Sequence, residues 1–377
     1  MKFTMAQGDL LSVLKRVCEG IEKRNSIPIL DCVRIKANDA GGVVTFTGTD
    51  LDNEISIVVG ADVAAAGEAC ARARAMLQIV EALSEPVTIE QEGDHPVTLT
   101  SGNAHFTDHE IGALPVRDHP VFPSFAIAQQ FVLAVPMLWN AIETVKFAIS
   151  TEETRYYLNG ICLHALIKDG KTWLRFVATN GHQLAWCDVP APHGLTVLGM
   201  KIVPRATVRI LSALLEGHVN VVHVEIGSTG DNKIAFRLGD IVLKAKLIDG
   251  TFPDYARVIP TEPQTEIVFE AEAIHGAVKR MTAVLADHRP IVFGFESVDA
   301  ALSVRNHDGV QAHERVAWRE IKGRGMEIGF YGRYIANILE RCSDRVVLKL
   351  TDSSSPAIVE CPSRPEIGFV LMPMMRV

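Results

Sequence analysis

An internal repeat is the feature that most constrains how this chain folds. The turn segment FPSF at 122–125 returns 130 residues later as FPDY at 252–255. A second feature has the same period, because Thr49 in VTFTGTDLDNEI corresponds to Thr179 in LRFVATNGHQLA. A third copy, LSVRNHDGVQA near Asp308, follows after a similar interval. Agreement of separate features on one long period predicts duplicated domains rather than a solenoid.

The length of the chain agrees with this prediction. A chain of 377 residues exceeds the roughly 250 to 300 residues that one core usually supports. The repeat places the expected domain boundaries so that the three domains comprise residues 1–126, 127–258 and 259–377.

Each repeat shows the same order of helical and strand periodicity. Apolar residues three and four apart predict two helices per repeat, over 8–22, 72–84, 134–149, 203–216, 271–286 and 331–341. Runs rich in Val, Ile, Thr and Phe are separated by turn dipeptides such as Gly41-Gly42, Asp169-Gly170 and Asp308-Gly309, which predict antiparallel hairpins. We therefore expect an α+β fold in which both helices of each domain cover one face of antiparallel sheet.

Targeting and redox signals are few. The N-terminus has charged residues within its first ten positions and no apolar core of a signal peptide, and no apolar run reaches the roughly 18 residues that span a bilayer. We expect a cytoplasmic protein without a membrane partner. The seven cysteines include no CxxC pair, so we expect buried, reduced thiols rather than a disulfide framework or a zinc site.

Motifs for catalysis are missing from the sequence. It contains no Walker A motif, no dinucleotide-binding GxGxxG after a strand, no GxSxG elbow and no HExxH. His105 and His109 lie in a strand and turn, which does not favour a metal site. Asp118-His119 and Asp287-His288 lack a neighbouring nucleophile. We therefore expect no catalytic residues, no metal and no cofactor, and a chain that is not an enzyme.

Basic residues gather in the expected helices. Those segments contain more Lys and Arg than Asp and Glu, although the chain has a net charge of −8. One interpretation is a basic surface that attracts phosphate groups. The other is that Lys and Arg are good helix formers on solvated faces.

Short segments along the whole chain resemble the bacterial DNA polymerase III beta subunit, the sliding clamp family. They are MKFT at 1–4, IPIL at 27–30, TGTDL at 47–51, RYYLNG at 155–160, VATNGH at 177–182, IVPR at 202–205, FPDYARVIP at 252–260, EIGF at 327–330 and LMPM at 371–374. The resemblance implies three clamp domains per chain and a head-to-tail homodimeric ring with helices inside and sheets outside. It implies a processivity factor for DNA replication that encircles double-stranded DNA without reading its sequence.

The resemblance also implies three sets of functional residues. The set near DNA is Arg24, Arg74, Lys201 and Arg205. The dimer set is Phe106, Val284 and Leu285. The set that docks peptides of the polymerase III catalytic subunit, the clamp loader and other proteins with clamp-binding motifs is Leu158, Thr179, Gly181, His182, Gln183, Leu184, Pro253, Arg257, Val258, Tyr334, Val370, Leu371, Met372, Pro373 and Met374.

Two departures from the family pattern fall in the docking set. The family usually has Asp-Gly-His-Arg-Leu where this chain has NGHQL at 180–184, and the additional Met375 moves the terminal Arg376 by one position. These departures leave open whether the chain is a principal clamp or a divergent second copy. An alternative function is a clamp-fold scaffold or decoy that binds partner peptides without productive loading on DNA.

Overall fold

The computed structural model describes residues 1–22, 26–102, 107–216, 220–228, 230–284, 289–295, 299–305 and 309–374. Its contacts divide the chain into two compact units. Unit 1 comprises 1–139, 192–194 and 206–247, and unit 2 comprises 140–191, 195–205 and 248–377. Each unit takes part of the middle repeat, because sheets continue across the borders between repeats.

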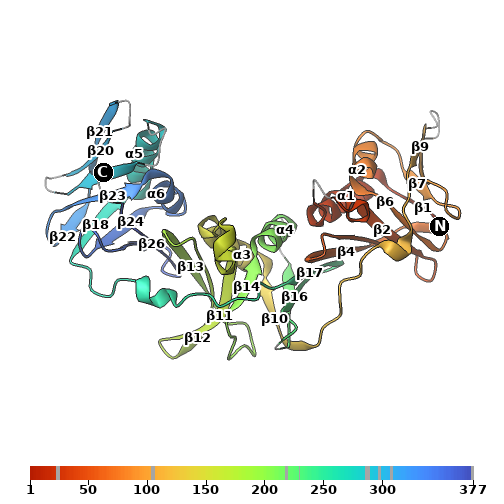
Figure 1. Cartoon of the computed structure of the whole chain (residues 1–377), viewed down its shortest axis with the longest axis horizontal. Coiled ribbons are helices and arrows are strands. Elements are labelled where there is room, and N and C mark those ends of the chain that lie inside the picture. The colour runs from red at the N-terminus through yellow and green to blue at the C-terminus, as the bar shows by residue number, and fades with distance from the viewer. Residues whose placement is uncertain are drawn as a thin grey trace. The chain divides into compact units, whose positions relative to one another are not determined.

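Unit 1 contains two antiparallel sheets among its described residues (Figure 1). The first has the order β5 (Asp62–Ala65), β1 (Lys2–Met5), β7 (Val87–Glu90), β8 (Val97–Ser101), β9 (Thr107–Ile111). The second has the order β10 (Ile127–Ala134), β15 (Val221–Gly227), β16 (Lys233–Leu238), β17 (Ile241–Lys246), β4 (Asn53–Gly60), β3 (Val43–Thr49), β2 (Cys32–Asn38), β6 (Gly67–Arg72). The pairing of β17 with β4 joins the middle repeat to the first.

Unit 2 is also built on antiparallel sheets. One has the order β14 (Lys201–Pro204), β11 (Gly160–Lys168), β12 (Lys171–Thr179), β13 (Gln183–Pro190), β26 (Ile367–Leu371), β25 (Ala357–Glu360), β24 (Arg345–Leu350), β18 (Thr265–Glu270), β22 (Glu320–Lys322). The other has the order β21 (Gln311–Ala317), β20 (Asp299–Arg305), β19 (Pro290–Gly294), β23 (Glu327–Tyr331). Here β13 pairs with β26 and joins the middle repeat to the last.

The six helices predicted from apolar periodicity are confirmed. They are α1 (Gln7–Val17), α2 (Ala73–Glu81), α3 (Val135–Val145), α4 (Arg205–Leu215), α5 (Ala271–Val284) and α6 (Gly332–Leu339). In unit 1, α1 packs on α2 and on β3 and β4, while in unit 2, α5 packs on α6 and on β18 to β21. Short 3-10 helices follow or connect these elements at Cys18–Gly20, Pro28–Asp31, Val116–Asp118, Lys146–Ala148, Glu153–Leu158 and Tyr255–Val258.

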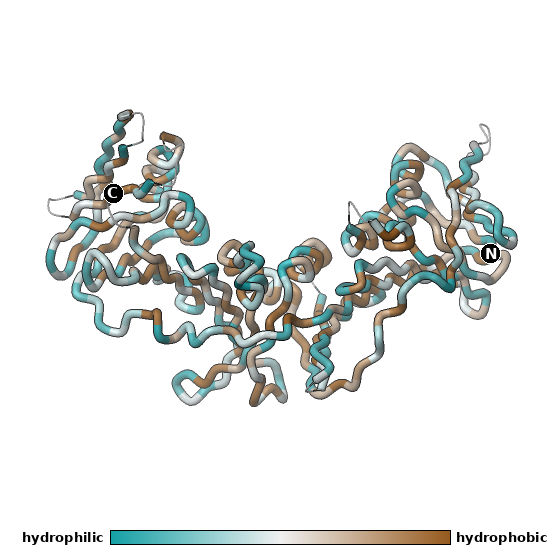
Figure 2. Tube along the Cα trace, viewed as in Figure 1, coloured by the Kyte–Doolittle hydropathy of each residue, from teal (hydrophilic) through white to brown (hydrophobic). Residues whose placement is uncertain are grey.

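Strand alternation places one row of side chains in each core. Figure 2 shows hydrophobic residues interspersed with hydrophilic ones along the strands. In β7, for example, Val87 and Ile89 are buried while their neighbours are half-buried. The three expected hairpins are confirmed by antiparallel pairing of β2 with β3, β11 with β12 and β20 with β21. The second turns through Asp169 and Gly170, both with positive φ, whereas Asp308 in the turn of the third lies outside the described residues.

The cysteine prediction is correct for five residues and wrong for two. Cys18, Cys32, Cys70, Cys162 and Cys187 are buried free thiols. Cys342 and Cys361, however, form a disulfide with a Cα–Cα distance of 5.7 Å, which lies in the usual range. They meet because the end of α6 lies beside the loop after β25.

The described residues contain no group of His, Cys, Asp and Glu that could hold a metal ion, and no helix there is long and apolar enough to cross a membrane.

A buried ion pair holds β12 and β13 together in unit 2. Arg175 and Asp188 face each other across the two strands, and Arg175 donates to both carboxylate oxygens, at 2.6 and 2.7 Å. Their side chains are only 10% and 4% exposed. Burial acts against the charged guanidinium, but the hydrogen bonds and charge of Asp188 outweigh it and raise the pKa of Arg175.

We predict that Asp188→Ala lowers the free energy of unfolding of unit 2 by about 3 to 5 kcal/mol, because it leaves a buried guanidinium without its counter-ion. Chemical denaturation monitored by circular dichroism measures this change. The control in the same unit is Glu320→Ala, which removes an exposed ion pair to Lys322 and should cost less than about 1 kcal/mol. Equal losses in the two variants would contradict the prediction.

Candidate functional site

The predicted docking residues come from separate segments of unit 2 and fall into three groups by exposure. Six are buried: Leu158, Thr179, Gln183, Leu184, Val370 and Leu371. Four are half-buried: Tyr334, Met372, Pro373 and Met374. Five are exposed: Gly181, His182, Pro253, Arg257 and Val258. The set thus has an interior part and a surface part that a peptide can reach.

The interior part is one apolar cluster, which we call the docking floor. It consists of Leu158, Cys162, Val177, Leu184, Ile202, Phe252, Tyr255 and Val370, with Tyr157, Trp186, Ile248 and Ile259 packed against it. Leu184 and Val370 are direct partners in the ladder between β13 and β26, so strand pairing fixes their separation. Of the predicted residues, Leu158, Leu184 and Val370 belong to the docking floor.

A tight turn at 179–184, the docking turn, leads into β13. Thr179 Oγ1 donates to the Gln183 carbonyl at 2.8 Å and accepts the Gly181 N–H at 3.1 Å. Asn180 Oδ1 accepts the N–H groups of His182 and Gln183, both at 3.0 Å. Gly181 has φ +87°, and a Cβ there would meet a side-chain nitrogen of Arg155 at 2.6 Å. The positive φ favours glycine at this position, and a larger residue would also have to displace the end of the Arg155 side chain.

Two contacts attach the docking turn to the last repeat. The His182 carbonyl accepts the Met372 N–H at 2.9 Å, which extends the pairing of β13 with β26 by one residue. The His182 ring stacks on Tyr334 of α6, with centroids 6.2 Å apart and planes at 19°. Met374 continues the segment, and its N–H donates to the Gly329 carbonyl at 2.8 Å. These contacts bring Tyr334 and the 372–374 segment to the turn.

The segment at 252–258 is anchored by a buried polar network, which was not predicted from the sequence. The hydroxyl of Tyr255 donates to His164 Nε2 at 2.7 Å, and it accepts a hydrogen bond of 3.5 Å from Arg175. His164 Nδ1 in turn donates to the Ala165 carbonyl at 2.9 Å. Burial lowers the pKa of His164 and thus favours the neutral imidazole, whose Nε2 can accept from Tyr255. The repeated FPDY segment was the sequence signal for Tyr255, whereas no sequence feature singled out Arg175.

The exposed residues of this segment lie just beyond that anchor. Pro253 precedes the short helix Tyr255–Val258, and Arg257 pairs with Asp254 at 2.8 Å on the surface. Val258 is 42% exposed, so part of its apolar surface is available to a ligand.

The side-chain amide of Gln183 is buried and only partly hydrogen-bonded. Its side chain is 3% exposed, and Nε2 donates to the Phe147 carbonyl at 3.3 Å. No donor among the described residues reaches its buried Oε1. The residue that departs from the family pattern is therefore part of the interior and does not present its side chain at the surface.

The first repeat contains a second copy of the docking turn, at 49–54 in unit 1. Thr49 Oγ1 donates to the Asn53 carbonyl at 2.7 Å, Asp50 Oδ1 accepts the Asn53 N–H at 2.6 Å, and Leu51 takes the positive φ of 78°. The next residue is Glu54, which is 5% exposed. Its carboxylate accepts the Phe122 N–H at 3.0 Å and the ammonium of Lys244 at 2.8 Å. The strand pair Glu54 and Lys244 in unit 1 thus forms an ion pair at the place where unit 2 has the apolar strand pair Leu184 and Val370.

The predicted DNA-facing residues have different environments. Arg74 on α2 is half-buried and donates to the Ile21 carbonyl at 2.8 Å, so part of its role is structural. Lys201 opens β14 and is half-buried, and Arg205 is the exposed first residue of α4. Arg24 lies outside the described residues.

The predicted dimer residues are described only in part. Val284 is the half-buried last residue of α5. Phe106 and Leu285 lie outside the described residues, as do Met375 and Arg376 near the C-terminus and the pair Asp287-His288. His109 is exposed on β9, while His105 is not described. His119 is buried and donates from Nδ1 to the Pro120 carbonyl at 3.0 Å.

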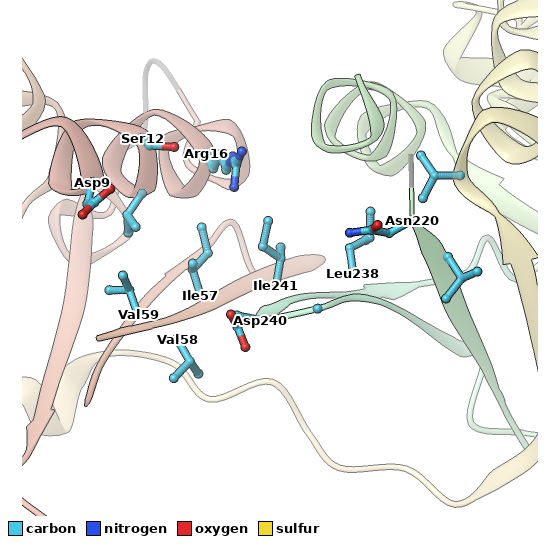
Figure 3. A pocket seen from close by; sticks show the side chains of 14 residues that line it. Asp9, Ser12, Arg16, Ile57, Val58, Val59, Asn220, Leu238, Asp240 and Ile241 are labelled. Atoms are coloured by element: carbon cyan, nitrogen blue, oxygen red, sulfur yellow. The ribbon is translucent and has the colours of Figure 1, made fainter. Parts of the chain in front are cut away.

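A cavity of about 330 Å³ lies in unit 1 (Figure 3). α1 contributes Asp9, Ser12 and Arg16, and the end of β4 contributes Val58 and Val59. The remaining lining comes from Val13, Ile57, Val135, Asn220, Val221, Leu238, Gly239, Asp240 and Ile241. None of these residues belongs to the predicted docking, DNA or dimer sets.

Comparisons with known proteins cover the whole chain. The N-terminal, central and C-terminal domains of the DNA polymerase III beta subunit match residues 1–123, 133–254 and 256–375. The beta sliding clamp of Caulobacter vibrioides NA1000 is 34% identical over 379 residues, which cover 99% of this chain and all of the relative. The Escherichia coli K12 clamp is 30% identical with the same coverage.

Solved structures agree with the sequence relatives. The DNA polymerase sliding clamp of Caulobacter crescentus matches with a TM-score of 0.92 and 33% identity, covering 100% of both chains. The sliding clamp of Bartonella birtlesii bound to griselimycin matches with a TM-score of 0.93 and 33% identity, again over 100% of both chains. The three repeats, their paired helices and antiparallel sheets, and these full-length matches lead to one conclusion: the chain belongs to the bacterial DNA polymerase III beta subunit family, the beta sliding clamps.

Proposed function

We propose that this chain works as a DNA sliding clamp that encircles duplex DNA as a head-to-tail homodimer and holds replication proteins on it. The observation that carries the proposal is the match of all three domains to clamp relatives along the full chain. In this proposal the domains comprise 1–126, 127–258 and 259–377, and the chain acts in the cytoplasm beside the chromosome. No observation favours the scaffold or decoy alternative.

The proposed mechanism is a topological link without catalysis. A closed ring that contacts phosphates loosely can slide, because phosphate contacts carry no sequence information. Slow dissociation then comes from ring closure, and processivity comes from the partner that the ring carries. The ring has a basic inner surface and two identical junctions, and each chain carries one peptide site. In this proposal the chain supplies no catalytic group and no cofactor.

We propose that the peptide site is the surface above the docking floor. The polymerase III catalytic subunit, the clamp loader and other proteins with clamp-binding motifs would each insert the apolar C-terminal part of a short peptide between Val258 and Met372. Buried Leu184 and Val370 support this surface from below. The exposed residues of the docking turn, Gly181 and His182, would contact the polar N-terminal part of the peptide. Methionines at 372 and 374 suit varied partners, because their flexible side chains repack readily.

For the DNA-facing residues, we predict that replacing Arg24, Lys201 and Arg205 together with Glu weakens binding to a short primed duplex and flattens its salt dependence. Each lost phosphate contact should remove roughly 0.9 from the log-log slope. Arg74 is left in place because its guanidinium bonds to Ile21 and its loss would disturb the fold. Fluorescence anisotropy against salt concentration provides the slope.

The matched control for that experiment has the same charge change elsewhere. Lys168, Lys171 and Arg117 are exposed and do not belong to the predicted DNA set, so their replacement with Glu should leave the slope nearly unchanged. If both triple variants changed the slope equally, only net charge would matter and the assignment of the inner residues would be wrong.

For the peptide site, we predict that Met372→Ala weakens binding of a short peptide with an N-terminal Gln and apolar C-terminal residues by roughly tenfold, as expected for loss of an apolar anchor. Calorimetric titration measures the affinity. Met200→Ala is the control, because Met200 is 46% exposed and is not part of the docking set. Unchanged affinity in Met372→Ala would remove that residue from the site.

The variant Gln183→Arg restores the arginine that the family usually has at this position. Tighter peptide binding by this variant would show that the departure from the family pattern weakens docking.

For ring closure, we predict that Leu285→Asp converts a dimer of about twice 41.2 kDa into a folded monomer. In this proposal Phe106 of one chain packs against Val284 and Leu285 of the other, so an unpaired carboxylate would be buried at both junctions at a cost of several kcal/mol. Sedimentation gives the mass and circular dichroism checks the fold. Ile167→Asp, at a residue 74% exposed, should stay dimeric. A Leu285→Asp variant that remains dimeric, or that unfolds, would place Leu285 in a domain core instead.

A further inference from the structure

The disulfide in unit 2 joins two segments that both lead to the docking site. Cys342 follows α6, the helix that carries Tyr334, and Cys361 begins the loop that leads to β26 and then to Met372. Cys342 is half-buried, whereas Cys361 is 1% exposed. The Cys342 sulfur also lies 3.6 Å from the Ile338 carbonyl, which can accept the thiol proton when the bond is reduced. A reduced Cys342 thiol therefore has a hydrogen-bond acceptor within reach.

Two arginines next to the disulfide hold the end of α3. Arg364 donates to Asn140 Oδ1 at 3.2 Å and to Thr144 Oγ1 at 3.3 Å. Arg341 donates to the Glu143 carbonyl at 3.4 Å. Cations at the C-terminal end of a helix are favourable because the last carbonyls carry partial negative charge. Arg364 also donates to the Arg341 carbonyl at 3.5 Å, so the disulfide and the two arginines form one connected group.

A continuous set of contacts leads from this group to the docking turn. The Arg341 guanidinium lies 4.3 Å from the centroid of the Phe147 ring, and that ring contacts Phe369 of β26. The Phe147 carbonyl accepts the side-chain N–H of Gln183, the residue that closes the docking turn. A second route runs along α6 to Tyr334, which stacks on His182. Both routes end in the turn at 179–184.

We propose that Cys342 and Cys361 form a reversible redox site that sets the affinity of the docking site, with tighter peptide binding when the disulfide is formed. The inference rests on the proposed docking function. The bond holds α6 and the loop before β26 in the arrangement that supports the docking turn, so the bound geometry is organised in advance. Reduction frees the two segments and allows the turn to sample other arrangements.

The redox step is thiol–disulfide exchange with a low-molecular-weight disulfide. The more accessible Cys342 thiolate attacks one sulfur of that disulfide, which forms a mixed disulfide and releases one thiolate. The Cys361 thiolate then attacks the Cys342 sulfur, forms the protein disulfide and releases the second thiolate. The two protein thiols lose two protons and two electrons, and the small disulfide gains them as two thiols.

The test compares peptide affinity in the two redox states of the full chain. The peptide is the Gln-initiated peptide described above, and the states are set with reduced or oxidised glutathione and verified by thiol alkylation and mass spectrometry. We expect the oxidised protein to bind at least about fivefold more tightly, the low end of typical coupling between sites. Cys342→Ser/Cys361→Ser should bind like the reduced protein in both buffers. Arg341→Gln should still form the disulfide but show a smaller difference between the states.

Linkage supplies a second, independent readout. If oxidation tightens peptide binding by some factor, saturating peptide must shift the glutathione equilibrium toward the disulfide by the same factor. Failure of Cys342 and Cys361 to form the bond in oxidised glutathione would overturn the redox site without reference to any peptide. Equal affinity in the two verified states would overturn the coupling. If the disulfide forms but the peptide binds in neither state, the docking proposal itself fails, and the coupling fails with it.

Discussion

The backbone pairing of β13 with β26 is the constraint on which the candidate docking site depends. These strands come from different repeats, and their ladder places Leu184 opposite Val370 and Gln183 opposite Leu371. The chain between them must close a long loop, and the apolar contacts of the docking floor, which join Leu184 and Val370, offset part of the entropic cost. Loss of this pairing would separate the docking turn from the 372–374 segment.

The two copies of the turn show how one backbone motif can serve two purposes. In both, a threonine hydroxyl and an Asn or Asp side chain satisfy the backbone, and one residue takes a positive φ. The difference lies in the residue that follows. Leu184 adds to an apolar floor, whereas Glu54 binds Lys244 and the Phe122 N–H. The same fold thus offers apolar support for a ligand in unit 2 and an internally satisfied ion pair in unit 1.

The sequence predicted the parts of the fold that depend on local periodicity. All six helices were expected because their apolar residues follow the helical repeat, and the docking turn was found because it is duplicated. The sequence did not predict contacts between distant segments. The Cys342–Cys361 bond requires the end of α6 to meet the loop after β25, which no spacing of cysteines reveals. The resemblance likewise gave no sign that Arg74, which it assigned to the DNA set, would bond to the Ile21 carbonyl within its own unit.

The central claim is that the chain stays on DNA by enclosing it, so the most direct measurement compares retention on closed and cut DNA. The chain is loaded by a bacterial clamp loader with ATP onto nicked circular duplex, washed in high salt to remove electrostatic binding, and followed before and after one enzymatic cut. The account predicts stable retention on the circle and rapid loss from the ends once the DNA is linear. Equal retention on both forms, or equal loss from both, would contradict a topological link.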